Sequence, residues 1–248
     1  MGKWRFGLLA ALTFLPLFGQ ADAAQEVGWS ITQTAKGSPM GSGATMIITP
    51  TGMRTSDAKS GVSLFTRGPA WNVVLFNAQN RSIYQTSLAN WLRSIQTRRA
   101  GGRFEGATWK RGGTTQISGA RAYEFLIDRP PSGGGRPVKG PDGKMRVLPA
   151  ISAAKLYVAQ DIATPPEISN LISKIYGVPD CQRIPLRMEV TEVGKRPILA
   201  VDTVRIARVN VPDSMFAIPV GFKPVKSDME VFIDSQSMNA IDDLLKDL

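Results

Sequence analysis

Residues 184–193 read IPLRMEVTEV, and their alternation decides the fold class. Apolar side chains recur at every second position, at Ile184, Leu186, Met188 and Val190, and the residues between them are polar or charged after Pro185. Successive side chains of a strand point to opposite faces, so this segment predicts a strand with one apolar and one polar face. Strands of this kind are typical of antiparallel sheets that keep one face in water.

Similar short runs predict strands along most of the chain. We expect them at 29–34, 44–49, 53–55, 62–66, 71–76, 81–86, 107–111, 114–118, 121–127, 153–160, 198–209 and 229–233. Gly112-Gly113 predicts a hairpin turn between two of these strands, because paired glycines suit the tight turns that join antiparallel neighbours.

Three amphipathic segments predict helices that pack on the sheet. The first follows Ser87 as N-cap and has apolar residues at helical spacing, Leu88, Trp91, Leu92 and Ile95. The second has Thr164 as N-cap, Glu167 completing a capping box, and Gly177 at its end. The third spans about 235–247 near the C-terminus.

The first 23 residues have the order of a secretory signal peptide. Lys3 and Arg5 precede an apolar run at 7–18, and Ala21-x-Ala23 provides small residues for cleavage. We therefore expect export to the periplasm or secretion, and a single mature domain over 24–248. Within it, the Pro- and Gly-rich basic segment near 129–149 predicts an exposed loop without regular structure.

The composition excludes several kinds of chemistry. The chain has no histidine and one cysteine, so a Ser-His-Asp triad, an HExxH zinc site and a CxxC pair are absent. Its carboxylates show no calcium-loop spacing. We expect no catalysis, no metal and no cofactor. Cys181 is either a shielded apolar side chain or the site of an intermolecular disulfide.

The positive charge is concentrated in residues 93–146, where twelve Lys and Arg face four Asp and Glu, a net +8. Either this is a solvated face with a loop, or it contacts an anionic surface such as phospholipid headgroups. Nucleic acid is not expected, because no known binding module is visible. The candidate contact residues are Arg98, Arg99, Arg103, Lys110, Arg111, Arg136 and Lys139.

The order of elements, together with MFAIPVGFKPV at residues 215–225, resembles the LolA/LolB-like superfamily of periplasmic lipoprotein carriers. The resemblance implies an α+β fold, mainly antiparallel β, in which a curved half-barrel sheet carries about three helices. It also implies a cavity for acyl chains between the sheet and lid helices.

The resemblance implies an exported, non-catalytic carrier or binding protein for a lipid or a lipid-modified partner. The alternative is an envelope protein-binding or regulatory module of the same fold without a bound lipid. An acyl-sized cavity favours the first hypothesis, and a filled core favours the second. The candidate cavity residues are Met46, Ile48, Val74, Phe76, Trp91, Leu156, Val158, Leu186 and Met188.

Overall fold

The computed structural model describes residues 25–35, 43–98, 104, 106–131, 137–139, 145–147 and 150–232, and of residues 96–98, 138, 139 and 146 it describes the backbone alone. The expected signal peptide at 1–23 and the expected C-terminal helix at 235–247 lie outside these residues.

A twelve-stranded open sheet makes up most of the described chain. Its strand order is β14-β6-β5-β4-β3-β2-β1-β13-β12-β11-β8-β7, and all neighbours are antiparallel except β14 and β6. The strands on one side of the centre are β1 (Gln25–Ala35), β2 (Gly43–Ile48), β3 (Gly52–Ser56), β4 (Val62–Arg67), β5 (Asn72–Asn77), β6 (Ser82–Ser87) and β14 (Lys223–Pro224). Those on the other side are β13 (Ile198–Pro212), β12 (Pro185–Glu192), β11 (Ile151–Ala159), β8 (Ala120–Arg129) and β7 (Thr108–Ile117).

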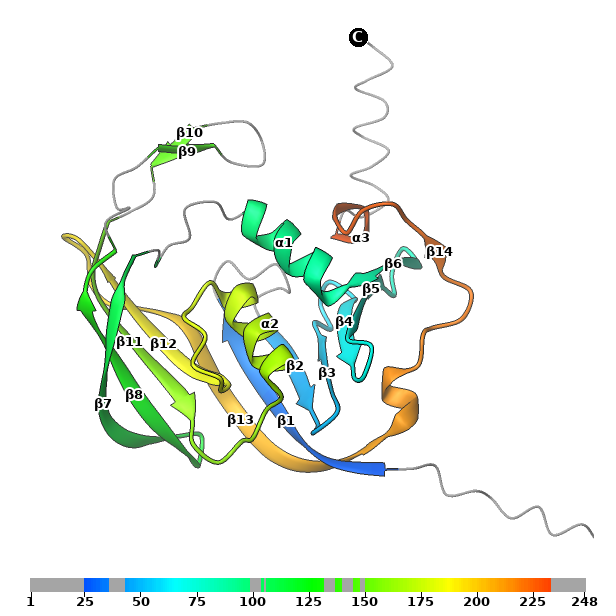
Figure 1. The fold of residues 1–248 in the computed structure, drawn as a ribbon, viewed down its shortest axis with the longest axis horizontal. Helices are drawn as coiled ribbons and strands as arrows, with labels where there is room; N and C mark the ends of the chain where they lie inside the picture. The colour runs from blue at the N-terminus through cyan, green and yellow to red at the C-terminus, as the bar shows by residue number, and fades with distance from the viewer. Residues whose placement is uncertain are drawn as a thin grey trace, which may run out of the picture.

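The sheet curves into a bowl, and two helices lie inside it (Figure 1). These are α1 (Leu88–Arg98) and α2 (Pro166–Tyr176), while the single turn of α3 (Met229–Phe232) contacts β5 and β6. The predicted α+β half-barrel, mainly antiparallel with helices on its concave side, is therefore confirmed.

The alternation that predicts β12 is present in the structure. Leu186, Met188 and Val190 are at most 2% exposed, whereas Arg187 and Glu189 keep intermediate exposure on the opposite face. β12 pairs with β11 and β13, so its apolar face lies in the middle of one half of the bowl. Burial of each of these side chains stabilises the fold by about 1.5–3 kcal/mol.

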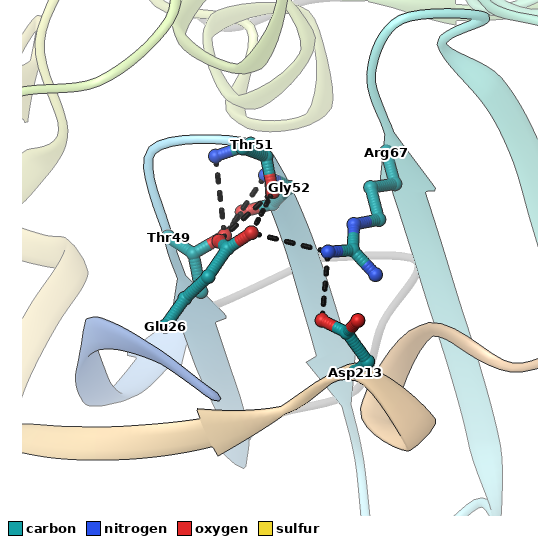
Figure 2. Close-up of polar contacts among 6 residues, drawn as sticks. All are labelled: Glu26, Thr49, Thr51, Gly52, Arg67 and Asp213. Carbon is teal, nitrogen blue, oxygen red and sulfur yellow. Dashed lines mark hydrogen bonds and ion pairs between the residues drawn. The ribbon is translucent and has the colours of Figure 1, made fainter. Parts of the chain in front are cut away.

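The outer face of the other half is covered by the chain that follows β13. A short 3-10 helix, η1 (Asp213–Phe216), brings Phe216 onto Phe65 at a ring separation of 6.4 Å. Arg67 joins this segment to the start of β1, because its Nη2 lies 2.8 Å from Asp213 Oδ1 and 3.1 Å from Glu26 Oε1 (Figure 2). Burial raises the pKa of Glu26, but hydrogen bonds from Thr51, Thr49 and Arg67 outweigh it and leave this pKa below its usual value.

The predicted hairpin at Gly112-Gly113 is wrong. β7 runs unbroken through both glycines, and its register against β8 shifts between Arg111 and Thr114, as in a β-bulge. The turn lies instead at Ser118 and Gly119, both with positive φ (49° and 83°), the pattern of a tight hairpin turn.

The caps of two helices differ from their sequence patterns. Ser87 caps α1 as predicted, because its Oγ accepts a hydrogen bond from the amide of Asn90 at 3.2 Å. Thr164 does not cap α2: Pro165 occupies the N-cap position without a side-chain cap, and the Thr164 hydroxyl donates to the Ile162 carbonyl instead. Gly177 ends α2 in the left-handed conformation, as predicted.

The predicted strand at 229–233 is also wrong, because Met229–Phe232 forms the helical turn α3. Glu230 supplies one half of a capping box before α3, because its carboxylate accepts hydrogen bonds from the Ser227 amide and hydroxyl at 3.0 and 3.1 Å. This local polar cap prevails over the strand propensity of the valine and phenylalanine that follow.

The segment near 129–149 contains some regular structure. β9 (Pro137–Lys139) and β10 (Met145–Val147) pair antiparallel as a separate small ribbon, away from the main sheet (Figure 1). The expectation of no regular structure is therefore wrong for these residues. Met145 and Val147 are 63% and 66% exposed, in keeping with the expected position on the surface.

Candidate functional site

The concave face beneath α1 and α2 is a continuous apolar surface. It combines inward-facing residues of β1 to β5 with the buried faces of both helices in one core cluster, which includes Ile31, Met53, Leu75 and Leu171. The helical periodicity of α2 places Ile168, Leu171, Ile172 and Ile175 on one face of the helix, and this apolar face packs on the sheet.

A small cavity lies between α2 and the sheet. Its lining is almost wholly apolar and consists of Ala44, Met46, Met53, Thr55, Ile172, Ile175 and Tyr176. Its volume of about 10 Å³ is enough for roughly one water molecule. Two of its walls are methionines, whose flexible side chains repack more readily than branched ones.

A buried hydrogen-bond network holds the C-terminal end of α2 to the sheet. The Tyr176 hydroxyl donates to Gln33 Oε1 at 2.6 Å, and Gln33 Nε2 donates to the Pro185 carbonyl at 2.7 Å and to Thr203 Oγ1 at 2.8 Å. Thr203 in turn donates to the Leu186 carbonyl at 2.6 Å. Burial raises the pKa of the Tyr176 hydroxyl, so it stays a neutral donor.

The nine predicted cavity residues are all buried, between 0 and 6% exposed, but they fall into three groups. Met46, Ile48, Trp91 and Leu186 belong to the core cluster under the helices. Leu156, Val158 and Met188 belong to a second cluster on β11 and β12. Val74 and Phe76 lie on the outer face, because they alternate along β5 with the inward-facing Val73 and Leu75. The cavity described above brings together only Met46 of the nine.

Two of the predicted anionic-contact residues can be placed by their side chains. Lys110 and Arg111 lie exposed on β7, the edge strand of the sheet. Lys110 Nζ is 3.1 Å from Asp128 Oδ1, and the Arg111 guanidinium lies over the Tyr123 ring, 4.0 Å from its centroid. The side chains of Arg98 and Lys139, and Arg99, Arg103 and Arg136 entirely, lie outside what the structure describes.

Cys181 follows α2 and packs beside the second cluster as a free thiol of intermediate exposure. Burial, and secondarily the charge of Asp180, raise the pKa of its thiol from 9.0 to about 11. A shift of this size lowers the thiolate fraction at pH 8 about 100-fold, and only the thiolate is nucleophilic.

We therefore expect iodoacetamide at pH 8 to alkylate native Cys181 about 100-fold more slowly than the same thiol in the urea-unfolded chain. Mass spectrometry of timed aliquots measures both rates. Asp180→Asn should accelerate the native reaction, since it removes the second cause of the raised pKa. Equal rates in native and unfolded protein would contradict the shielded thiol.

The described residues contain neither a cluster of metal ligands nor a membrane-spanning helix. No group of three or more His, Cys, Asp or Glu side chains is placed there to hold a metal ion. Among the helices of that part of the chain, none is both long and apolar enough for a transmembrane span.

Sequence reasoning missed Met53, Gln33 and Tyr176. The predicted strand at 53–55 contains Met53, but three residues are too few to show from their alternation which side of the strand is buried. Gln33 lies at an inward position of β1 and is 1% exposed, so hydropathy gives no sign of its burial. Tyr176 follows Ile172 by four residues on α2, and this spacing is the one signal that could have identified it.

Comparison with known proteins gives fold likenesses alone. No protein-family model matches the chain, and no curated protein matches its sequence. Among solved structures, it is similar to an uncharacterised conserved protein from Thermus thermophilus (9% identity, 81% of this chain and 90% of that one, TM-score 0.36). It is also similar to MucB in the MucA/MucB complex of Pseudomonas aeruginosa (11% identity, 84% and 60%, TM-score 0.34) and to the lipoprotein LppX of Mycobacterium tuberculosis (16% identity, 82% and 91%, TM-score 0.31). Likenesses at this level carry no conclusion about what this chain binds.

Proposed function

We propose that this protein is an exported, non-catalytic binding protein for a lipid or a lipid-modified partner, whose acyl chain enters between the concave face and α2. The observation that supports this most is the apolar interface of α2 with the sheet, which already contains a cavity walled by Met46 and Met53. A buried acyl chain contributes about 0.8 kcal/mol per CH₂, so a long chain could bind without specific polar contacts.

The described cavity is closed to such a ligand, since about 10 Å³ does not hold an acyl chain. Entry therefore requires α2 to move away from the sheet. Two kinds of contact hold α2 to the sheet. One is the apolar stripe of the helix, and the other is the hydrogen bond from the Tyr176 hydroxyl to Gln33. A helix held in this way is suited to act as a lid that opens for a ligand and closes over it.

The proposal predicts that a larger side chain in the cavity wall weakens lipid binding. Ala44→Phe places an aromatic ring where the acyl chain would lie, and we expect a loss of affinity for myristate of at least tenfold, or about 1.4 kcal/mol. Ala207→Phe is the matched control, since Ala207 lies on β13 outside the cavity and is partly exposed. Isothermal titration calorimetry of both variants and of the wild type measures the difference.

The outcome that would overturn the lipid proposal is a wild-type protein that binds neither myristate nor any component of a lipid extract from its host. Native mass spectrometry of the protein purified from its own export compartment gives the independent measurement. A bound mass of several hundred daltons that organic extraction removes supports the proposal.

A second candidate is a module that binds another protein of the envelope. The edge strand β7 favours it: the strand has ten residues, and eight of them are exposed. Unpaired edges can accept an extended peptide as a further strand. The same strand carries a bulge, Lys110 and Arg111, which are also the devices that keep an edge from pairing, so the lipid proposal is preferred.

A further inference from the structure

An aromatic surface extends the concave face beyond α2 onto β8 and β7. Tyr123, Phe125 and Ile127 alternate along β8 and so share one face, and Trp109 of β7 pairs with Ile127. All four are partly buried and pack against the second cluster, which contains Leu156 and Met188. Tyr176 packs against both this cluster and the one under α2, so apolar contacts are continuous from the cavity to β8.

Two guanidinium groups meet at the Tyr123 ring. Arg111 lies 4.0 Å and Arg183 5.3 Å from its centroid. Arg183 Nη1 donates to the carbonyls of Ala159 and Gln160 at 3.3 and 2.7 Å, which fixes its position. Within the described part of the chain, neither guanidinium has a carboxylate oxygen within 4.0 Å.

The surroundings leave an excess of positive charge. Arg121 lies two residues before Tyr123 on β8, and its Nε and Nη2 each lie 2.8 Å from a carboxylate oxygen of Asp161. The hydrogen bond from Arg121, and to a smaller extent the charge of Arg183, hold the pKa of Asp161 below its usual value. Three arginines with one aspartate give a net +2 around Tyr123, with Arg121 and Asp161 satisfied by each other.

An unused donor lies beside these cations. Trp109 precedes Arg111 by two residues on β7, so both point to the same face. Its indole Nε1 is buried and has no hydrogen-bond partner in the described structure. A buried donor without a partner is unfavourable, and an oxygen of a bound molecule that accepted its hydrogen bond would remove this cost.

We propose that Arg111 and Arg183 bind the anionic headgroup of a single-chain amphiphile whose hydrocarbon lies along Phe125 and Ile127 and continues past Tyr176 toward the cavity under α2. Arg183 uses its Nη1 for the two carbonyls, which leaves its Nε and Nη2 and the whole Arg111 guanidinium to donate to the oxygens of a phosphate or carboxylate. The proposal rests on the proposed function and deepens it, since it assigns the headgroup charge of the ligand and the end of the bowl where it binds.

Three matched probes test the assignment on the purified protein. Myristoyl lysophosphatidic acid carries the chain and the phosphate, monomyristoyl glycerol carries the same chain without charge, and glycerol 3-phosphate carries the headgroup alone. We expect the first to bind at least tenfold more tightly than the second, and the third not to bind at millimolar concentration. Calorimetry at low and at 0.5 M salt gives the affinities and their electrostatic share.

The variants separate the headgroup site from general effects. Arg111→Ala should remove most of the tenfold preference for lysophosphatidic acid and leave monomyristoyl glycerol binding unchanged. Arg183→Gln, which keeps an amide donor for the two carbonyls, should act in the same direction. Arg208→Ala is the matched control, because Arg208 lies at the same 4.0 Å over an aromatic ring, that of Trp29, on another part of the sheet.

The possible results bear differently on the headgroup site and on the proposed function. Equal wild-type affinity for the two chain-bearing probes overturns the headgroup site while the proposed function stands. Failure to bind the two chain-bearing probes, myristate and every component of the host lipid extract overturns the proposed function itself. Glycerol 3-phosphate binding as tight as that of lysophosphatidic acid overturns the amphiphile and leaves a site for a free anion. An equal loss in Arg208→Ala overturns the assignment to Arg111 and Arg183.

Discussion

Leu186→Ala is expected to destabilise the protein by about 3–4 kcal/mol, within the range of about 2–5 kcal/mol that truncation of buried leucines costs. Leu186 is 0% exposed on β12, between β13 and β11, and belongs to the core cluster under the helices. The substitution removes apolar contacts and leaves a cavity in the middle of a close-packed region that cannot collapse freely. For a chain of this length the melting temperature should fall by about 6–15 °C.

Leu199→Ala is the control for this prediction, since it makes the same chemical change at a site that is 42% exposed on the adjacent strand β13. We expect it to cost less than about 1 kcal/mol. Urea unfolding followed by tryptophan fluorescence measures both variants, and the four tryptophans of residues 24–248 supply the signal. Equal losses at the two positions would contradict the assignment of Leu186 to the core.

Strands that have one buried and one solvent-exposed face were predictable from the sequence. β12 is the clearest case, because Arg187 and Glu189 point to solvent and make the period of two visible in the sequence. The hairpin of β5 and β6 was predictable too, because Asn77-Ala78-Gln79-Asn80 forms a turn-prone polar segment between the β-rich runs at 71–76 and 81–86. The turn between β7 and β8 was not predictable. Gly112-Gly113 is as good a signal for a bulge as for a turn, and the turn itself uses a serine with positive φ.

The sequence indicates that the candidate site is apolar, but it identifies few of the residues that line it. An apolar strand face shows which side chains are buried, but it cannot show whether a helix or a loop covers them. β5 illustrates this, since Val73 to Phe76 are all buried and only the covering elements, helices within the bowl and η1 outside it, separate the two faces. Arg183 lies just before β12 and reaches Tyr123 across β11, where Val158 pairs with both Pro185 and Tyr123, so no sequence spacing connects the two residues.

Gln33→Leu is expected to destabilise the protein by about 2–4 kcal/mol and to loosen α2, although the two side chains have similar volume. Gln33 is 1% exposed and joins Tyr176, Pro185 and Thr203 through three hydrogen bonds. Leucine restores none of them, so the Tyr176 hydroxyl is left buried without its acceptor. Such an unpaired buried group costs more than the net value of the hydrogen bond that is lost.

Tyr176→Phe and the double variant Gln33→Leu/Tyr176→Phe complete a thermodynamic cycle. Because the double variant removes both the donor and its acceptor, it should be less destabilised than the sum of the single variants by about 1–2 kcal/mol. Hydrogen–deuterium exchange of the α2 amides tests the role of this network in holding the lid, and either single variant should exchange there faster than the wild type. If both were as protected as the wild type in α2 while losing global stability, the network would support the sheet at Pro185 and Thr203 rather than fasten the helix, and the opening of α2 would have to depend on its apolar stripe alone.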